Sequence, residues 1–579
     1  MASFARVLGD FGFRFLERTH LDQVSFRGVQ LQTLLQKHDR EAGHGGERYR
    51  LTPLRSSLHR AVGALPTILR EKAAERFLRR AGSPGPAAEH VFQYLLSAEM
   101  AKEKGGARHP EEATVAKGAD HFYQRQYRQY FNSTMGAFAV TAKMAFVCSG
   151  DAPRGWLWGR RRRVHAAMLE EIAGAPPIIV IDRQTVALPL LLPEPATEAA
   201  EVEAWLAGRK PMPGFYRAIA AGEEVRCAER RARARRRGAD GALIELTDAV
   251  LQSGKLAILA LHPHDPDAMG LHITLFGTQA LEADRVEEEY GFRAEVLDPW
   301  RHAASERGRR LRFLVGGVEE LFTQCSQNLF VKRPAADPDA PRRAAAWPNA
   351  WEPGLGLERL LNAQFEILQA TVSASGLPGA SPRNGDIGKA AYVGRRGTRT
   401  FVLIPYFPGN AVHGHAAKLW SNPYGELVIW DDHGALSAIT ISGPSWTVAH
   451  RTVEKDFPAI AANVAARQKR NGAAAARPEY WFLQEVAEIV QQVEPLAANS
   501  LDPSRSTCAI SAGGLARHGK KPAYFAADTL PPYDPALQHE REAAGRPIDP
   551  TGYDGYIFWA FEMAPALEAR RAHLDQLRA

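Results

Sequence analysis

The stretch FVLIPYFPGNAVHGHAAKLWSNPYGELVIWDDH, residues 401–433, carries more chemically reactive side chains per residue than any other part of the chain. Within it, apolar runs at 411–420 and 426–431 predict two strands, and SNPYG at 421–425 predicts the turn that joins them. A third run at 400–404 completes a set of adjacent strands. The stretch therefore predicts an antiparallel β-meander.

The meander is expected to extend over residues 388–452, because Gly394 and Gly397 predict a hairpin before residue 400. Helices are expected at 455–469 and 478–494, and a basic helix at the end of the chain. We therefore predict an antiparallel β-rich domain with C-terminal helices over 388–579. The proline-rich segment before it, 336–387, predicts a linker followed by a helix, with a loop at 373–386.

Two further regions precede the linker. Apolar spacing at three- and four-residue intervals predicts a mainly helical domain over 1–150. Over 176–335 short apolar runs alternate with helical segments, which predicts a mixed α/β domain with strands at 178–181, 242–246, 255–261, 271–276 and 311–315. The predicted fold class is therefore a multidomain α+β protein with a helical N-terminal region, a mixed α/β middle domain and an antiparallel β-meander C-terminal domain with flanking helices.

Composition narrows the class of protein. The chain has 579 residues, 45% hydrophobic and 24% charged, with a formal charge of +7, which is ordinary for a folded protein. The four cysteines are scattered and form no CxxC pair, which argues against a disulfide scaffold. We see no secretory signal and no apolar run near the ~20 residues that a membrane helix needs. A soluble, cytoplasmic protein without membrane contact is expected.

The first candidate site lies in the 401–433 stretch. If 411–420 is a strand, His413 and His415 point to one face, and Asp431 approaches them from the next strand. Two imidazoles and a carboxylate can hold a divalent zinc, manganese or iron ion with an open position. Catalytic roles then fall to Asp432 and His433, as base or support, and to Lys418, as a contact for an anionic group. Ordinary turn chemistry at 431–434 is the alternative.

The string His413-Gly414-His415-Ala416 is similar to the start of the metallo-β-lactamase metal motif. In that motif Asp-His follows, whereas this chain has Ala417 and Lys418. Two ligands are therefore absent, and the family is not assigned.

A second histidine cluster follows a predicted strand. It comprises His262, His264, Asp267 and His272, and LHITL at 271–275 resembles one half of the two-histidine phosphoesterase signature. That family pairs two His-x-Thr elements across a cleft. The other such element here is His450-Arg451-Thr452, in a different predicted domain.

Two arginine runs suggest an alternative function. They comprise Arg160, Arg161, Arg162, Arg163, Arg233, Arg235, Arg236 and Arg237. If both runs lie on one face, they could contact phosphates of nucleic acid or an acidic partner. A solvated surface is the commoner reason for such runs.

Several common enzyme classes are excluded, because the chain has no Walker A loop, no Rossmann glycine fingerprint, no HExxH and no GxSxG. Two functions remain. The first is a metal-dependent hydrolase that acts on an anionic, phosphoester-like small molecule. The second is a basic binding or assembly protein, not an enzyme, that contacts nucleic acid or an acidic partner.

Overall fold

The computed structural model describes residues 131–578 with internal gaps. The gaps are 152–161, 173, 194–224, 227–232, 238, 263–269, 291–293, 324–329, 333–356, 359–360, 362–365, 374–375, 384–390, 398, 408–413, 430–438, 471–477, 479, 493–502 and 506–562. The predicted helical region up to residue 130 lies outside the described residues.

One sheet of seven strands forms the first half of the described fold, in the order β2-β1-β7-β8-β9-β4-β3, with every neighbouring pair antiparallel. Its strands are β1 (Met144–Gly150), β2 (Val164–Glu170), β3 (Ile179–Val180), β4 (Thr185–Leu192), β7 (Leu256–Leu261), β8 (Leu271–Glu282) and β9 (Arg310–Thr323). Apolar side chains are buried on both faces of the central strands, as β1 and β7 show over their whole length.

A second sheet of ten strands forms the other half, with a main path β12-β11-β15-β16-β17-β14-β13. Its strands are β11 (Ile367–Val372), β12 (Pro378–Arg383), β13 (Tyr392–Arg396), β14 (Arg399–Tyr406), β15 (Tyr424–Ile429), β16 (Ile439–Ala449), β17 (Tyr480–Glu485), β18 (Glu488–Gln492), β5 (Val225–Arg226) and β6 (Arg233–Arg237). A separate two-stranded sheet pairs β10 (Phe330–Lys332) with β19 (Pro503–Arg505).

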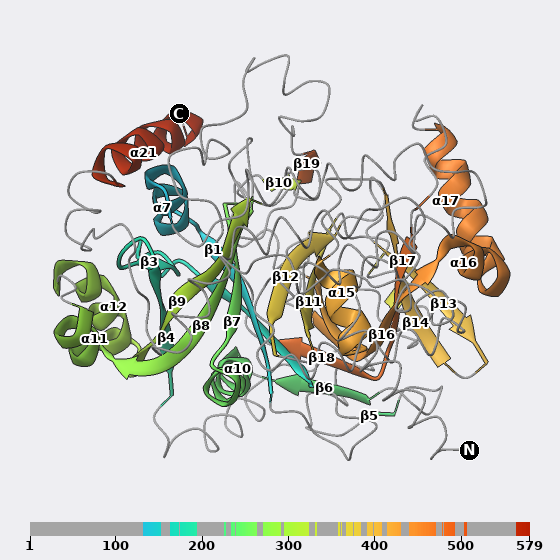
Figure 1. The fold of residues 1–579 in the computed structure, drawn as a ribbon, viewed down its shortest axis with the longest axis horizontal. Helices are drawn as coiled ribbons and strands as arrows, with labels where there is room; N and C mark the ends of the chain where they lie inside the picture. Colours follow the sequence, from blue (N-terminus) through green and yellow to red (C-terminus); the bar gives the residue numbers. More distant parts are fainter. Residues whose placement is uncertain are drawn as a thin grey trace, which may run out of the picture.

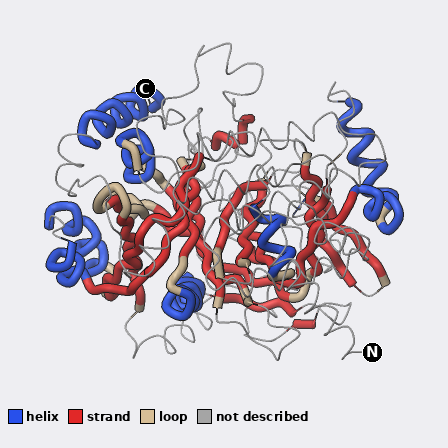
Figure 2. The backbone as a smooth tube through the Cα atoms, in the orientation of Figure 1, coloured by secondary structure: helices blue, strands red, loops and turns tan. Residues whose placement is uncertain are grey.

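Helices pack around these sheets (Figures 1 and 2). They are α7 (Ser133–Val140), α10 (Ala239–Ser253), α11 (Ala283–Tyr290), α12 (Ala294–Glu306), α15 (Gly414–Ser421), α16 (His450–Asp456), α17 (Pro458–Arg470) and α21 (Ala564–Arg578). Helix α21, near the C-terminus, lies beside α7 at the start of the described chain (Figure 1). Among the described residues, no helix combines the length and apolarity needed to span a membrane.

The predicted fold class is wrong. The described part of the chain is mostly antiparallel β-sheet with few helices. The C-terminal strands do not form a sequential meander, because β11 lies next to β15, and β14 lies next to β17. The second sheet also takes in β5 and β6, which come from the predicted middle domain. Strand order depends on long-range pairing, which local sequence patterns do not encode.

Two predictions of local secondary structure are wrong for a clear physical reason. Residues 242–246 belong to helix α10, whose buried residues Ala242, Leu246, Ala249 and Val250 follow the helical period. Residues 480–492 form strands β17 and β18, where the sequence pattern predicts a helix. In β17, Tyr480 and Phe482 enter one core cluster, whereas Trp481 and Leu483 enter another, which is the alternation of a strand.

Candidate functional site

The two large sheets pack against each other through one shared core. Its members come from β1, β2 and β7 on one side and from β11, β12 and β15 on the other, including Phe146, Cys148, Leu259, Ala370 and Val428. Polar and ionisable side chains border this apolar contact and are themselves buried. Burying ionisable groups costs free energy, so such a concentration is a candidate for function.

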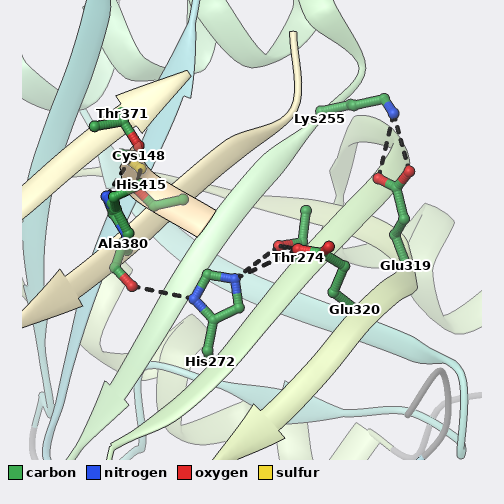
Figure 3. A network of polar contacts seen from close by, with 10 residues as sticks. Cys148, Lys255, His272, Thr274, Glu319, Glu320, Thr371, Ala380 and His415 are labelled. Atoms are coloured by element: carbon green, nitrogen blue, oxygen red, sulfur yellow. Dashed lines mark hydrogen bonds and ion pairs between the residues drawn. The ribbon is translucent and has the colours of Figure 1, made fainter. Parts of the chain in front are cut away.

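A chain of polar groups runs from the first sheet to the edge of the second (Figure 3). Thr274 on β8 donates to Glu320 on β9 over 3.1 Å, and Thr274 Oγ1 lies 3.0 Å from His272 Nε2. The other ring nitrogen, His272 Nδ1, lies 3.1 Å from the Ala380 carbonyl oxygen on β12. His272 also stacks on Phe322, with ring centroids 4.4 Å apart. The chain therefore links the sheets through a fixed imidazole.

The His-x-Thr pattern at 272–274 therefore has a structural meaning. The period of a strand places His272 and Thr274 on one face, and that face meets the second sheet. The other His-x-Thr element does not join it: His450, on α16, accepts a hydrogen bond from Trp481 over 2.9 Å. The two-element phosphoesterase arrangement is not formed by these residues.

On the opposite face of β12, helix α15 supplies two buried bases. His415 is 8% exposed and Lys418 is 6% exposed. The His415 Nδ1 atom lies 2.9 Å from the Thr371 hydroxyl on β11. A Cβ atom at Gly379 would lie 3.3 Å from the Lys418 side chain and 3.5 Å from His415 Cε1, so this glycine lets both bases approach β12.

The predicted strand at 411–420 is therefore wrong for its described part, because residues 414–421 are helical. His415 and Lys418 are three residues apart, which places both on the face of α15 that meets the sheet. The remaining members of the predicted metal and catalytic site, His413, Asp431, Asp432 and His433, lie outside the described residues. Within the described chain, no three His, Cys, Asp or Glu side chains are grouped so that they could hold a metal ion.

Arg383, at the end of β12, is the third base on this side. Its side chain is 8% exposed, and its Nε donates to the Gln369 amide oxygen over 2.9 Å. The guanidinium lies 4.8 Å from the Phe482 ring centroid and 5.7 Å from that of Tyr406. Burial lowers the pKa of Arg383. In the part of the chain that the structure describes, no carboxylate pairs with it.

We call Arg383, His415 and Lys418 the cationic site. Burial lowers the pKa of His415 well below its usual value, and the nearby charges of Arg383 and Lys418 lower it further. His415 is therefore neutral at neutral pH. The site can accept negative charge, and its neutral imidazole can accept a hydrogen bond.

Cys148 lies across β12 from the cationic site. Its thiol donates to the Gly379 carbonyl over 3.3 Å, and burial, with the charge of Glu426, raises its pKa. The group is therefore a thiol rather than a thiolate, and it serves packing rather than nucleophilic attack.

The second histidine cluster is described only in part. His262, directly after β7, is 5% exposed, and His272 takes part in the chain of polar groups. His264 and Asp267 lie outside the described residues.

The two arginine runs have different surroundings. Arg162 donates to the Asp151 carbonyl over 2.8 Å, and its backbone bonds to Asn422. It therefore ties the first sheet to the second. Arg163 is exposed. The residues Arg233, Arg235, Arg236 and Arg237 belong to strand β6, which pairs with β18. Arg160 and Arg161 lie outside the described residues.

Sequence reasoning missed Arg383, Thr371, Glu320 and the role of Gly379. The segment PGASPR, which forms β12, has the composition of a loop, and its sequence predicts one. Its prolines are tolerated because β12 is an edge strand, and its small residues allow close approach of side chains from both sides. The sequence feature that could have indicated Arg383 is its position at the end of a run of small residues.

Comparisons with known proteins add little. No family model matches the chain. No curated protein matches it. Among solved structures, HupZ of Group A Streptococcus is 15% identical, covering 26% of this chain and 97% of that one, with a TM-score of 0.17. The heme storage protein HutZ of Vibrio cholerae is 16% identical over 23% of this chain and 91% of that one, with a TM-score of 0.15.

A third structure is a pyridoxamine 5′-phosphate oxidase-related, FMN-binding protein from Nostoc punctiforme PCC 73102. It is 15% identical over 25% of this chain and 82% of that one, with a TM-score of 0.16. At such TM-scores the likeness supports no conclusion about this chain, whose function must be inferred from its own residues.

Proposed function

We propose that this protein binds a small anion of the phosphoester class at the cationic site. The observation that carries the proposal is Arg383, a buried guanidinium that lies on aromatic rings and has no carboxylate partner within the described chain. Two further buried bases, His415 and Lys418, come from helix α15, and the charge of Arg383 acts on His415. A buried guanidinium without a carboxylate costs free energy, and an anion at this position offsets that cost.

The chemistry of the donors favours a tetrahedral oxyanion. A guanidinium presents paired N–H groups that match two phosphate oxygens, and an ammonium supplies a compact charge. Among the neighbours on β11 and β12, Thr371 and Ser381 have buried hydroxyl groups that can add neutral hydrogen bonds. The aromatic wall from Phe482 and Tyr406 excludes water on one side and strengthens these contacts.

The test uses inorganic phosphate and the full chain. Titration calorimetry is expected to give saturable binding to wild type, and affinity is expected to fall roughly 10- to 100-fold in Arg383→Met. Arg396→Met is the matched control, because Arg396 is an exposed arginine that pairs with Asp456. Equal binding by wild type and Arg383→Met would contradict the proposal.

Metal-dependent hydrolysis of such an anion is a further part of the proposal. It rests on His413 and Asp431, which lie outside the described residues. Metal analysis of purified wild type and of His413→Ala tests it: equal metal content in the two would rule out a site at this histidine.

The alternative of nucleic-acid binding rests on the arginine runs. The Arg162 side chain donates to the Asp151 carbonyl, and its backbone N–H donates to the Asn422 side chain. These contacts indicate a structural role for Arg162 within the fold rather than a place on a solvated surface. A cytoplasmic location belongs to the proposal as well, on the basis of four scattered cysteines.

A further inference from the structure

Gln369, on β11, has a side-chain amide whose orientation is fixed by its neighbour. The side chain is fully buried, and its Oε1 accepts a hydrogen bond of 2.9 Å from Arg383 Nε. A guanidinium N–H can only donate, so the amide atom that faces it must be the oxygen and cannot be the nitrogen. The Nε2 group is therefore the other end of the amide, and both of its N–H groups are donors.

This Nε2 group has no hydrogen-bond partner within the part of the chain that the structure describes. A buried N–H without an acceptor has lost its water and gained nothing in exchange, which lowers stability. Backbone groups around it are used in strand pairing, since β11 pairs with both β12 and β15. An unused donor at this depth is uncommon, and it indicates a place for an acceptor atom that the described chain does not supply.

The register of the strands places Gln369 among the donors of the cationic site. In the antiparallel pair of β11 and β12, Ser381 lies opposite Gln369, and Gly379 lies opposite Thr371. Residues two apart on a strand share a face, so Gln369 and Thr371 both face the side that α15 covers, where Lys418 approaches Gly379. The amide and the bases therefore lie on one face of the second sheet.

The chemistry of these donors limits what can bind between them. Arg383 keeps the N–H groups of Nη1 and Nη2, because Nε is the atom that donates to Gln369. Amide and guanidinium N–H groups only donate, so the ligand atoms that meet them must be acceptors, as the unprotonated oxygens of a phosphate or a phosphomonoester are.

We infer that Gln369 is a direct ligand of the anion: its Nε2 binds one oxygen of the phosphate group while the Arg383 guanidinium binds another. The role of Gln369 rests on the proposed function and deepens it, because it adds a neutral donor, held in place by Arg383, to the charged donors of the cationic site.

The substitution Gln369→Glu tests this role with almost no change in shape. The variant loses the Nε2 donor and places a carboxylate against the Arg383 guanidinium, so the chain itself supplies the negative charge. We expect phosphate affinity, measured by calorimetry on the full chain, to fall roughly 100-fold or more. Urea unfolding should still show a cooperative transition, which separates loss of binding from loss of the fold. Wild-type phosphate affinity in Gln369→Glu would overturn the role of Gln369.

A second set of variants separates contact with the anion from support of Arg383. Gln369→Met removes the amide, Arg383→Met removes the guanidinium, and a third variant has both changes. The readout is the rise in urea midpoint on adding phosphate, because this rise also reports weak binding. A direct contact predicts that Gln369→Met lowers phosphate affinity roughly tenfold, both in wild type and in Arg383→Met. No further loss in the double variant would mean that Gln369 acts only through Arg383, which would overturn the direct contact.

Gln184→Met is the matched control, because Gln184 is a fully buried glutamine directly before β4 of the first sheet. It should leave the phosphate-induced rise unaltered. Loss of phosphate binding in Arg383→Met, together with wild-type binding in both single variants of Gln369, would overturn the role of Gln369 alone. Absence of phosphate binding to wild type by calorimetry would overturn the proposed function and the role of Gln369 with it.

Discussion

Single residues at the sheet interface show how much the partner of a buried polar group matters. Thr274 and Thr440 are both buried strand threonines, yet Thr274 contacts His272 and Glu320, whereas the Thr440 hydroxyl has no hydrogen-bond partner among the described residues. A buried hydroxyl without a partner lowers stability, because it has lost its water and gained nothing in exchange.

We predict that Thr440→Val stabilises the protein by about 1 kcal/mol, because valine has the same shape and no hydroxyl to desolvate. The midpoint of urea unfolding should rise. Thr274→Val, measured in parallel, should lower the midpoint, since it removes the hydroxyl that donates to the buried Glu320. A lower midpoint for Thr440→Val would show that its hydroxyl has a favourable contact.

A second residue, His165, predicts how stability depends on pH. Burial lowers its pKa, but Asp151 and Glu245, 3.9 and 3.5 Å away, outweigh burial and raise the pKa to about 9. The folded state therefore holds this proton more tightly than the unfolded state, whose histidine pKa is about 6.5. The resulting stability is fully present below about pH 6.5 and is lost as the pH rises through about 9.

For wild type we expect this histidine to contribute on the order of 2 kcal/mol at low pH. His165→Gln should flatten the fall in urea midpoint between about pH 6.5 and about pH 9, a window set by the two pKa values. His302→Gln, at an exposed histidine that pairs with Glu306, is the control and should keep the fall. An unchanged slope in His165→Gln would exclude the raised pKa.

At the scale of elements, strand β16 is the centre of the second sheet. It pairs with β18 over residues 439–442 and with β17 over residues 445–449, so its partner changes at Gly443. A Cβ atom at Gly443 would lie 2.0 Å from the Glu485 carbonyl oxygen, at the point where the chain passes from β17 to β18. No side chain fits there.

Gly443→Ala is therefore expected to destabilise the protein by ~3 kcal/mol or more, because the clash is with backbone that cannot turn aside. Gly425→Ala is the matched control: Gly425 is the register partner of Gly443, and its nearest neighbours are side-chain atoms of Gln484 and Ser445 at 3.2 Å and beyond. Thermal unfolding should show a much smaller loss for the control. Similar losses in both variants would show that the backbone contact at Gly443 is not what excludes a side chain.

Elements whose periodicity is local were predictable from the sequence. The hairpin of β13 and β14 around Gly397 and the final helix α21 are confirmed. Strand β12 was not predictable, because its glycine, alanine and serine matter through contacts with Lys418 and Cys148, far away in the chain. The same distinction holds for the residues of the candidate site. The sequence indicated His272, His415 and Lys418 by residue type, whereas Arg383 could be recognised only from the packing of β12.

For the whole molecule, the shared core between the sheets decides whether the described halves unfold together. Phe146 lies in that core and is fully buried, with members from both sheets around it. Phe313 is equally buried, but its cluster joins β9 to helices α11 and α12, and the described members of that cluster include none from the second sheet. The two phenylalanines therefore separate inter-sheet packing from packing within one half.

We predict that Phe146→Ala, at a cost of about 3–5 kcal/mol, speeds amide hydrogen exchange in both sheets, because the cavity removes contacts that each sheet makes with the other. Exchange measured by mass spectrometry should rise in peptides from β8 and β9 and in peptides from β11 and β15. Phe313→Ala should carry a similar cost but raise exchange only in the first sheet. If Phe146→Ala left β11 and β15 as protected as in wild type, the two sheets would unfold independently of each other.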